Sequence, residues 1–237
     1  MGRESFSLTL LVSLISDSSQ STDFSELLDK FTAVPAATRG GGVPVTGWAR
    51  VAMAVQSLAD QSEALMLVDL ADGALIIIDW GRKDYWWLGG SGTFPQHPTV
   101  NKVRVFRGAG ARLPFMQEQP SDLASLLWNI GLHAFPSGPA WWLDADAHYR
   151  LDRWPDFNSL EYRPEHVRMT ALLGTGIYSA ASLALSSGAT RDSAQNMLNA
   201  LGLMGLLRAE QPSEPEGGSA HAPAPGLFAR LRARWGI

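Results

Sequence analysis

Apolar and polar positions in the middle of the chain follow the pattern of β-strands joined by tight turns. Residues 65–70 and 74–79 are both β-prone, and Ala71-Asp-Gly73 between them is a turn sequence. Asp-Gly between two such runs is the strongest short-range signal for a hairpin. A second turn at residues 81–84 leads into Tyr85-Trp-Trp-Leu88. The pattern therefore predicts a three-stranded antiparallel meander.

Strand patterns also occur outside this meander. In Phe6–Ile15 every even-numbered residue is apolar, which is the period-2 signature of a strand. Glu4 and the lack of a small-x-small cleavage site argue against an export signal. Residues 102–106 are a further strand candidate, and residues 140–143 and 148–151 are expected to pair as a second short hairpin.

Three segments show the period of amphipathic helices. Apolar residues recur at helical spacing within residues 23–31, 48–59 and 121–132. The third helix begins with Ser121, the expected cap. Residues 36–44 contain three consecutive glycines and a proline, so we expect a loop there.

The composition shifts after residue 160, where three helical stretches follow one another up to residue 209. We therefore expect an α+β protein with a largely antiparallel sheet of about four to six strands and its helices over residues 1–158. A helical module follows over residues 159–209. Residues 210–226 are rich in Pro, Gly and Glu and are expected to be a disordered, flexible linker. Residues 227–237 form a separate amphipathic tail.

The most specific motif lies in the helical module. A helix-turn-helix needs small residues between its helices, a glycine at the turn and apolar positions that lock the second helix. Here the glycine is Gly188, and the packing positions are filled by Leu183, Ala184, Ala189, Ala194 and Met197. With a preceding helix over residues 165–173 and a further helical run over residues 198–207, the segment 163–209 resembles the winged-helix and helix-turn-helix superfamily.

Such modules bind DNA when the second helix carries side chains that reach bases and phosphates. Arg191, Gln195 and Asn196 have this chemistry and are the candidate residues for docking to DNA or to a protein. Across residues 164–208 three arginines face two acidic residues, which leaves one net positive charge. A specific DNA-binding protein neutralises roughly six to ten phosphates. We therefore expect the module to dock a protein, with DNA as the alternative.

Composition narrows the classes of function. The chain has 237 residues, 46% hydrophobic and 18% charged, and its formal net charge is −4. These values fit a folded protein and not one that coats nucleic acid through bulk positive charge. The absence of cysteine excludes disulfides, thiolate metal sites and cysteine nucleophiles. No apolar run approaches the roughly 18 residues of a membrane helix. Sixteen Arg against three Lys are typical of a GC-rich bacterial genome.

Tryptophan is concentrated in one region. Seven of the nine tryptophans lie between Trp80 and Trp154, including the adjacent pairs at 86–87 and 141–142. Neighbours on a strand point to opposite faces, so one member of each pair is expected to leave the first core face. We expect a sheet buried on both faces, with exposed anchors for a partner as the alternative.

The last eleven residues form a basic amphipathic segment. Its apolar stripe and its basic side chains are the expected partner-binding residues: Leu227, Phe228, Leu231 and Trp235, with Arg230, Arg232 and Arg234. A protein groove and an anionic membrane surface are both suited to such a segment. A helix that packs back onto its own domain is the structural alternative.

The catalytic and cofactor signals are weak. Asp144, Asp146 and His148 alternate, so a strand would place them on one face with metal-like spacing. A fourth ligand is not identifiable, and we expect a solvated strand face instead. The glycine-rich segments at 40–42 and 89–92 match neither the dinucleotide fingerprint nor a P-loop. We therefore expect no catalytic residues, no metal site and no cofactor.

These patterns favour a non-enzymatic bacterial cytoplasmic adaptor or signalling regulator that acts through protein–protein contacts. The helix-turn-helix module and the tail are the expected docking elements. The alternative is a DNA-binding transcriptional regulator that uses the helix over residues 191–207. An enzyme of another type is a third hypothesis, and its site would be sought at residues 144–156.

Overall fold

The computed structural model describes most of the chain between residues 32 and 210. The described ranges are 32–34, 38–39, 43–58, 63–89, 93–107, 119–136 and 138–210. The expected strand at 6–15, the expected helix at 23–31 and the expected tail at 227–237 lie outside these ranges, as does the expected linker apart from Glu210.

The centre of the sheet is the meander that the sequence predicts. Strand β4 (Ala64–Leu70) pairs with β5 (Leu75–Asp79), and β5 pairs with β6 (Asp84–Leu88). The turn between β4 and β5 has Gly73 at φ 91°, a left-handed conformation that favours glycine. Strand β7 (Val100–Arg107) is longer than predicted and pairs antiparallel with the other side of β4.

Two short strands complete this sheet. Strands β1 (Thr32–Ala33) and β8 (Ser121–Asp122) lie at its edges, and the order is β1-β7-β4-β5-β6-β8 with every pair antiparallel. A separate two-stranded pair joins β2 (Thr38–Arg39) to β3 (Val43–Pro44). The prediction of a loop over 36–44 is therefore wrong at both strands, because glycines and proline interrupt a long strand but permit a two-residue one.

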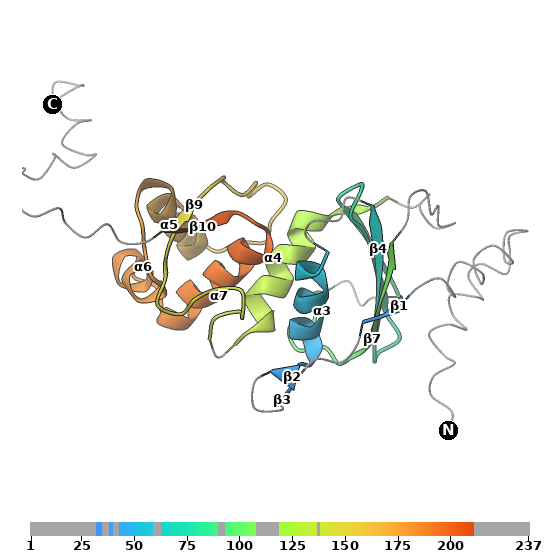
Figure 1. Ribbon diagram of the computed structural model, residues 1–237. Helices are drawn as coiled ribbons and strands as arrows, with labels where there is room; N and C mark the ends of the chain where they lie inside the picture. The colour runs from blue at the N-terminus through green and yellow to red at the C-terminus, as the bar shows by residue number, and fades with distance from the viewer. Residues whose placement is uncertain are drawn as a thin grey trace, which may run out of the picture.

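Two helices cover one face of the sheet (Figure 1). Helix α3 (Gly47–Gln56) is the predicted helix at 48–59, shortened at its end, and α4 (Leu123–Ala134) is the one predicted at 121–132. The cap of α4 is Asp122, which accepts a hydrogen bond from the Ala124 amide at 2.9 Å, and not Ser121. Apolar residues of both helices and of the sheet form the first core cluster.

Residues 138–210 form the helical half of the molecule, and residues 32–136 form the sheet half. The helical half contains α5 (Pro164–Thr175), α6 (Ala180–Ser187) and α7 (Arg191–Leu203). Strands β9 (His148–Leu151) and β10 (Leu207–Glu210) pair antiparallel beside them. The described chain is thus of the α+β class.

The turn between α6 and α7 is built as the helix-turn-helix pattern requires. Gly188 has φ 72°, in the left-handed region that a residue with a side chain rarely adopts. Ser179 caps α6, and Thr190 caps α7 by accepting a hydrogen bond from the Ser193 amide at 3.1 Å. Local sequence therefore determines where both helices begin.

Three expectations in this half are wrong. Strand β9 pairs with β10 and not with residues 140–143, which form a turn. The run at 198–207 is not one helix, because α7 ends at Leu203 and Gly205 (φ 68°) turns the chain into β10. Asp144 and Asp146 lie in a turn, where the Asp144 carboxylate accepts the Asp146 amide, so the expected solvated strand face does not form.

The two tryptophan pairs behave differently. Trp87 packs against the first cluster, and Trp86, 3% exposed, lies on the opposite face of β6, as alternation predicts. Trp141 and Trp142 are in a turn and not on a strand, and both rings contact Phe135 edge-on at 5.2 and 5.3 Å. Alternation therefore applies to the first pair only.

Helix α4 joins the two halves. It contacts α3 on one side and α7 on the other, as Figure 1 shows. A Cβ placed on Gly131 would lie 2.3 Å from the Ala200 Cα, so only glycine permits this crossing of α4 and α7. Trp128 of α4 is fully buried in the second core cluster, which otherwise consists largely of helical-half residues. Strand β9, which the predicted domain boundary at residue 158 assigns to the sheet half, contributes Tyr149 and Leu151 to this cluster.

None of the helices in the described ranges combines the length and the apolarity needed to cross a bilayer.

Candidate functional site

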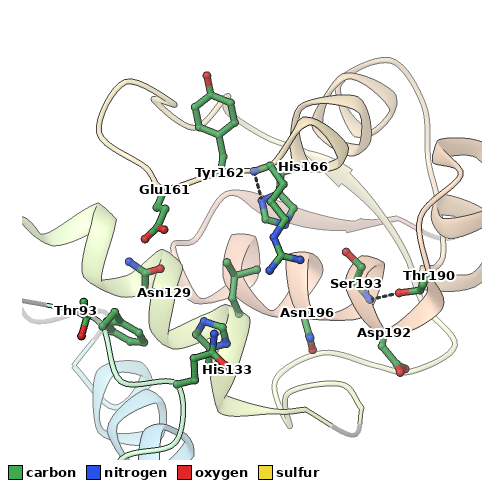
Figure 2. Close-up of a pocket in the computed structure, with 14 residues that line it drawn as sticks. Thr93, Asn129, His133, Glu161, Tyr162, His166, Thr190, Asp192, Ser193 and Asn196 are labelled. Atoms are coloured by element: carbon green, nitrogen blue, oxygen red, sulfur yellow. Dashed lines mark hydrogen bonds between the residues drawn. The ribbon is translucent and has the colours of Figure 1, made fainter.

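A cavity of about 700 Å³ lies at the junction of the two halves (Figure 2). Its first wall belongs to the sheet half and consists of Thr93, Phe94 and Gln96, together with Asn129, Leu132 and His133 of α4. Its second wall belongs to the helical half and includes Glu161, Arg163, His166, Ser193 and Asn196. Residues from both halves are therefore needed to form it.

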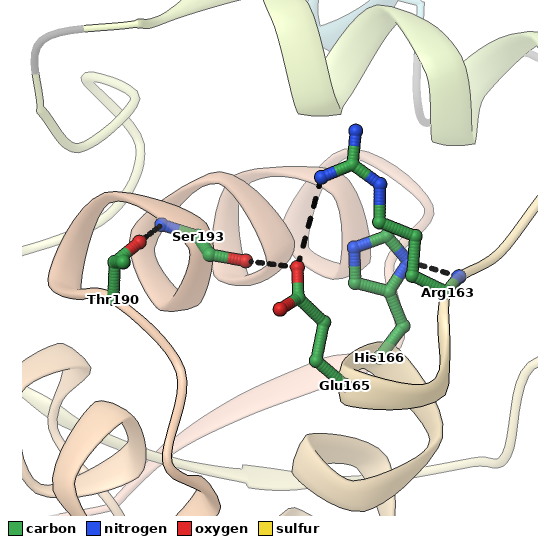
Figure 3. Close-up of polar contacts among 5 residues, drawn as sticks. All are labelled: Arg163, Glu165, His166, Thr190 and Ser193. Atoms are coloured by element: carbon green, nitrogen blue, oxygen red, sulfur yellow. Dashed lines mark hydrogen bonds and ion pairs between the residues drawn. The ribbon is translucent and has the colours of Figure 1, made fainter.

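The second wall is held by the N-terminal ends of α5 and α7 (Figure 3). The Arg163 amide donates to Nδ1 of His166 at 3.2 Å, which caps α5. The Ser193 hydroxyl donates to Oε1 of Glu165 at 2.8 Å, and the same oxygen lies 3.8 Å from Nη1 of Arg163. This serine–glutamate hydrogen bond connects the first turn of α5 to the first turn of α7.

Both histidines of the cavity favour the neutral form. Burial lowers the pKa of His166, against a smaller opposing effect of Glu165. Its Nδ1 already accepts a backbone hydrogen bond, which requires that nitrogen to be unprotonated. Burial also lowers the pKa of His133, and His97 and Arg163 lower it further. The ionic groups of the cavity are then Arg163, Glu161 and Asp192.

Aromatic contacts hold Phe94 in the first wall of the cavity. Phe94 is stacked between Trp48 and His133, with ring centroids 4.8 and 5.8 Å away. Trp48 donates its indole N–H to the Pro95 carbonyl at 2.7 Å, which holds the segment after β6 against α3. The Tyr162 ring, in contrast, points away from the other labelled residues and is 50% exposed.

The cavity does not contain the hydrogen bonds of a nucleophilic catalytic site. Ser193 donates to a carboxylate, and Nδ1 of His166 is occupied by the backbone. In the part of the chain that the structure describes, no serine hydroxyl is hydrogen-bonded to a histidine, and no group of three metal-ligating side chains converges. The arrangement supports binding through hydrogen bonds and charge, and no step of bond cleavage follows from it.

The structure separates the three candidate docking residues of α7. Arg191 is exposed at the start of the helix, Gln195 donates to Oδ1 of Asn199 at 3.1 Å, and Asn196 lines the cavity. The candidate residues of the tail, from Leu227 to Trp235, lie outside the described ranges.

Sequence reasoning missed the burial of α7. From Met197 to Leu201 every residue of this helix is buried, including the polar Asn199. The Asn199 side chain donates to the Gly138 carbonyl at 3.0 Å and accepts from the Ala140 amide at 2.9 Å, so it holds the chain that links the halves. The sequence contains one signal of this burial. Gly131 lies inside the helical pattern of α4, and a glycine inside a helix often marks the close approach of another backbone.

Exposed apolar side chains mark a second feature of the helical half. Among the described residues, all six large apolar side chains that are exposed belong to this half: Trp141, Trp154, Tyr162, Val167, Ile177 and Leu185. On α5, Val167, Ala171 and Gly174 lie on one stripe, and the Trp154 ring covers Gly174, at 3.0 Å from where a Cβ would stand. Leu185 of α6 is 86% exposed.

Comparison of the chain with protein-family models, with curated proteins and with solved structures gave no match.

Proposed function

We propose that this protein is a non-enzymatic bacterial cytoplasmic adaptor or signalling regulator that acts through protein–protein contacts, with the helical half as its principal docking element. The observation that carries the proposal is the set of six exposed apolar side chains, all in the helical half. Exposed aromatic and aliphatic side chains that share one region are typical of contact surfaces, because leaving them in water is unfavourable.

The proposal includes the resemblance of this region to winged-helix modules, and the order of elements in the helical half supports that resemblance. Helices α5, α6 and α7 follow one another as in such modules, with the glycine turn between the last two. A β-bridge between Tyr149 and Tyr178 adds a third short strand position to β9 and β10. Winged-helix modules carry a small sheet of this kind beside their helices.

Charge and burial favour a protein partner over DNA. Residues 159–210 contain four arginines and four acidic residues, so their net charge is zero. Affinity for DNA depends on neutralising phosphates, and this module offers no excess of positive charge for that purpose. The middle of α7, which would have to enter the major groove, is packed against α4.

The decisive experiment is recovery of partners from native lysate by the full chain and by three variants. Leu185→Glu and Val167→Glu place a charge on exposed apolar positions and are expected to lose the partner. Ser186→Glu adds the same charge beside Leu185 and is expected to retain it. Partner recovery that resists nuclease and depends on Leu185 or Val167 supports the proposal. Equal recovery by all variants would contradict it.

The basic tail is proposed as a second docking element. A chain without residues 227–237 would retain its fold and bind the same protein partner more weakly. If the shortened chain binds the partner with unchanged affinity, the tail is not a docking element. Binding of the full chain to anionic vesicles, lost in the shortened chain, would instead indicate the membrane surface as the target of the tail.

The alternative function is transcriptional regulation through DNA. Arg191 and Arg208 are exposed and carry the positive charges that the alternative requires. This alternative predicts salt-dependent affinity for duplex DNA that falls on changing both arginines to Ala, and partner recovery that collapses after nuclease treatment.

A further inference from the structure

Two opposite charges of the cavity between the halves project from one extended segment. Glu161 and Arg163 line the cavity, whereas the Tyr162 side chain between them points away from the other labelled residues (Figure 2). The backbone is extended at Arg163, with φ −109° and ψ 159°, and in an extended chain residues i and i+2 face the same side. Their Cα atoms are then about 7 Å apart. The segment therefore presents a carboxylate and a guanidinium side by side.

Neither of these charges has a close partner of opposite sign. Arg163 lies 3.8 Å from Glu165, at the long end of the range of ion pairs, and its side chain is 74% exposed. In the described ranges, the Glu161 carboxylate makes no hydrogen bond and no ion pair. Burial and Arg163 lower the pKa of His133, and Glu161 opposes this effect, so both charges lie near a ring of the first wall. Both are available to a ligand in the cavity.

A buried hydrogen-bond donor lies beside these charges. His166 is 5% exposed, and its Nδ1 accepts the Arg163 amide, so the proton of its neutral ring is on Nε2. No described residue accepts a hydrogen bond from Nε2–H, which is turned away from the bond to Arg163 (Figure 3). A donor buried to this degree normally has a partner, because leaving it unpaired costs free energy. Since the ring lines the cavity, an acceptor group of a ligand would supply that partner.

Hydrogen bonds and ring contacts hold these groups in position. The indole N–H of Trp128 donates to the Glu161 carbonyl at 2.8 Å, and the Trp128 ring contacts His166 edge-on at 5.2 Å. Trp128 itself is fully buried. The segment from Glu161 to His166 is therefore fixed against α4. Binding to such a preformed site loses less free energy to ordering than binding to a mobile one.

The charges of the cavity select the kind of ligand. With both histidines neutral, Arg163 is its positive group, and Glu161 and Asp192 are its negative groups, which lie at opposite sides of the cavity in Figure 2. A simple anion would be repelled by Glu161, and a simple cation by Arg163. A molecule with adjacent positive and negative groups is attracted by both. The volume of about 700 Å³ is within the range of small-molecule sites, roughly 300–1,000 Å³.

We propose that the cavity binds a small zwitterion of the α-amino-acid type, with its ammonium group at Glu161 and its carboxylate at Arg163 and at Nε2 of His166. The rest of the cavity, lined by Asn129 and Asn196 among others, is available to the side chain of the ligand. Ligand binding here is additional to the proposed docking function and requires no protein partner.

Derivatives of the ligand allow a test on the unaltered protein. The protein amino acids are screened by thermal shift with the purified full chain, and those that stabilise it are titrated by calorimetry. At least one is expected to bind. Its N-acetyl derivative lacks the ammonium group and its amide lacks the carboxylate, so each is expected to bind at least about tenfold more weakly, the effect of losing one charged hydrogen bond.

Two results of this titration would overturn the proposal. The first is that no amino acid binds, and the second is that an amino acid and its two derivatives bind with equal affinity. Since the purified chain is titrated without a partner, either result leaves the proposed docking function unaffected.

Two variants test the assigned positions. Glu161→Gln is expected to abolish the preference for the amino acid over its N-acetyl derivative, and Arg163→Gln the preference over its amide. The matched controls are Glu63→Gln and Arg153→Gln, at exposed residues that do not line the cavity, and both preferences should persist in them. Preferences that persist in both cavity variants, or that are lost equally in the controls, would overturn the proposal.

Discussion

The sheet half and the helical half of this protein differ in where they leave their apolar side chains. The sheet half encloses Met66, Val68 and Ile76 beneath α3 and α4, and none of its described residues is a large exposed hydrophobic. The helical half packs around a core that also includes Trp128 of α4, and it still exposes six such side chains. Under the proposed function, this excess of apolar surface identifies the helical half as the docking element.

The two halves differ little in the arrangement of their charged groups. In the helical half the ionic groups form pairs, such as Arg208 with Asp152 at 2.6 Å. The sheet half has an equivalent pair between Arg82 and Asp84. Neither half presents an unbalanced field in its described residues that would by itself select a nucleic acid. Apolar contact is therefore the property in which the halves differ most.

The largest effect is expected where the two halves touch. Gly131→Ala places a Cβ against the Ala200 backbone, which cannot move without shifting α7. We expect a loss of about 3 kcal/mol in the free energy of unfolding, measured by urea denaturation. Gly174→Ala is the control, since its Cβ meets only the exposed Trp154 ring, and its effect is expected to stay within about 1 kcal/mol. Equal losses for the two variants would show that the helix crossing is not the tight contact described above.

The second largest effect concerns the chain between the halves. Asn199→Ala removes the hydrogen bonds to Gly138 and Ala140 and leaves buried backbone groups without a partner. The expected cost is about 2 to 3 kcal/mol in urea denaturation. Gln195→Ala removes only the bond between the two side chains and should cost about 1 kcal/mol or less. If Asn199→Ala costs no more than Gln195→Ala, the Asn199 side chain does not hold the chain between the halves.

Acid is expected to destabilise the helical half through His166. Burial lowers the pKa of this histidine below its ordinary value of 6.5, so between the two values the unfolded chain binds more protons than the folded one. The free energy of unfolding therefore falls as the pH drops below 6.5, and this loss ends once the pH is below the folded pKa.

The measurement is the urea midpoint at several pH values for the natural chain and for His166→Gln. Glutamine keeps an acceptor for the Arg163 amide and does not titrate. The variant should lose part of the pH dependence, and His133→Gln should remove a further part, because the pKa of His133 is also lowered. A pH dependence that is identical in all three proteins would rule out both histidines as its source.

The smallest effect is expected at the surface of the helical half. Arg208 and Asp152 form an ion pair whose side chains are 62% and 50% exposed. Arg208→Ala should cost less than about 1 kcal/mol, and the cost should shrink as salt is added. A larger or salt-insensitive loss in thermal denaturation would mean that the pair holds β10 in place and is more than a solvated contact.

Sequence alone determined the elements whose signals are local. The turn Ala71-Asp-Gly73 specified the pairing of β4 with β5, and the turn at residues 81–84 led into β6, because a short turn fixes the register of the strands that it joins. The capping residue Thr190 and the left-handed Gly188 specified the turn between α6 and α7 in the same way. These signals act within a few residues and do not depend on what packs above them.

Tertiary structure decided everything that joins distant segments. Strand β9 pairs with a strand more than fifty residues later, although its own sequence suited a local hairpin. The cavity combines Phe94 and His133 with Ser193 and Asn196, and no periodicity relates such positions. The burial of α7 depended on Gly131 of α4, since the packing of two helices is determined by both surfaces together. A sequence pattern describes which face of an element is apolar, whereas the partner that covers this face is selected only when the whole chain is folded.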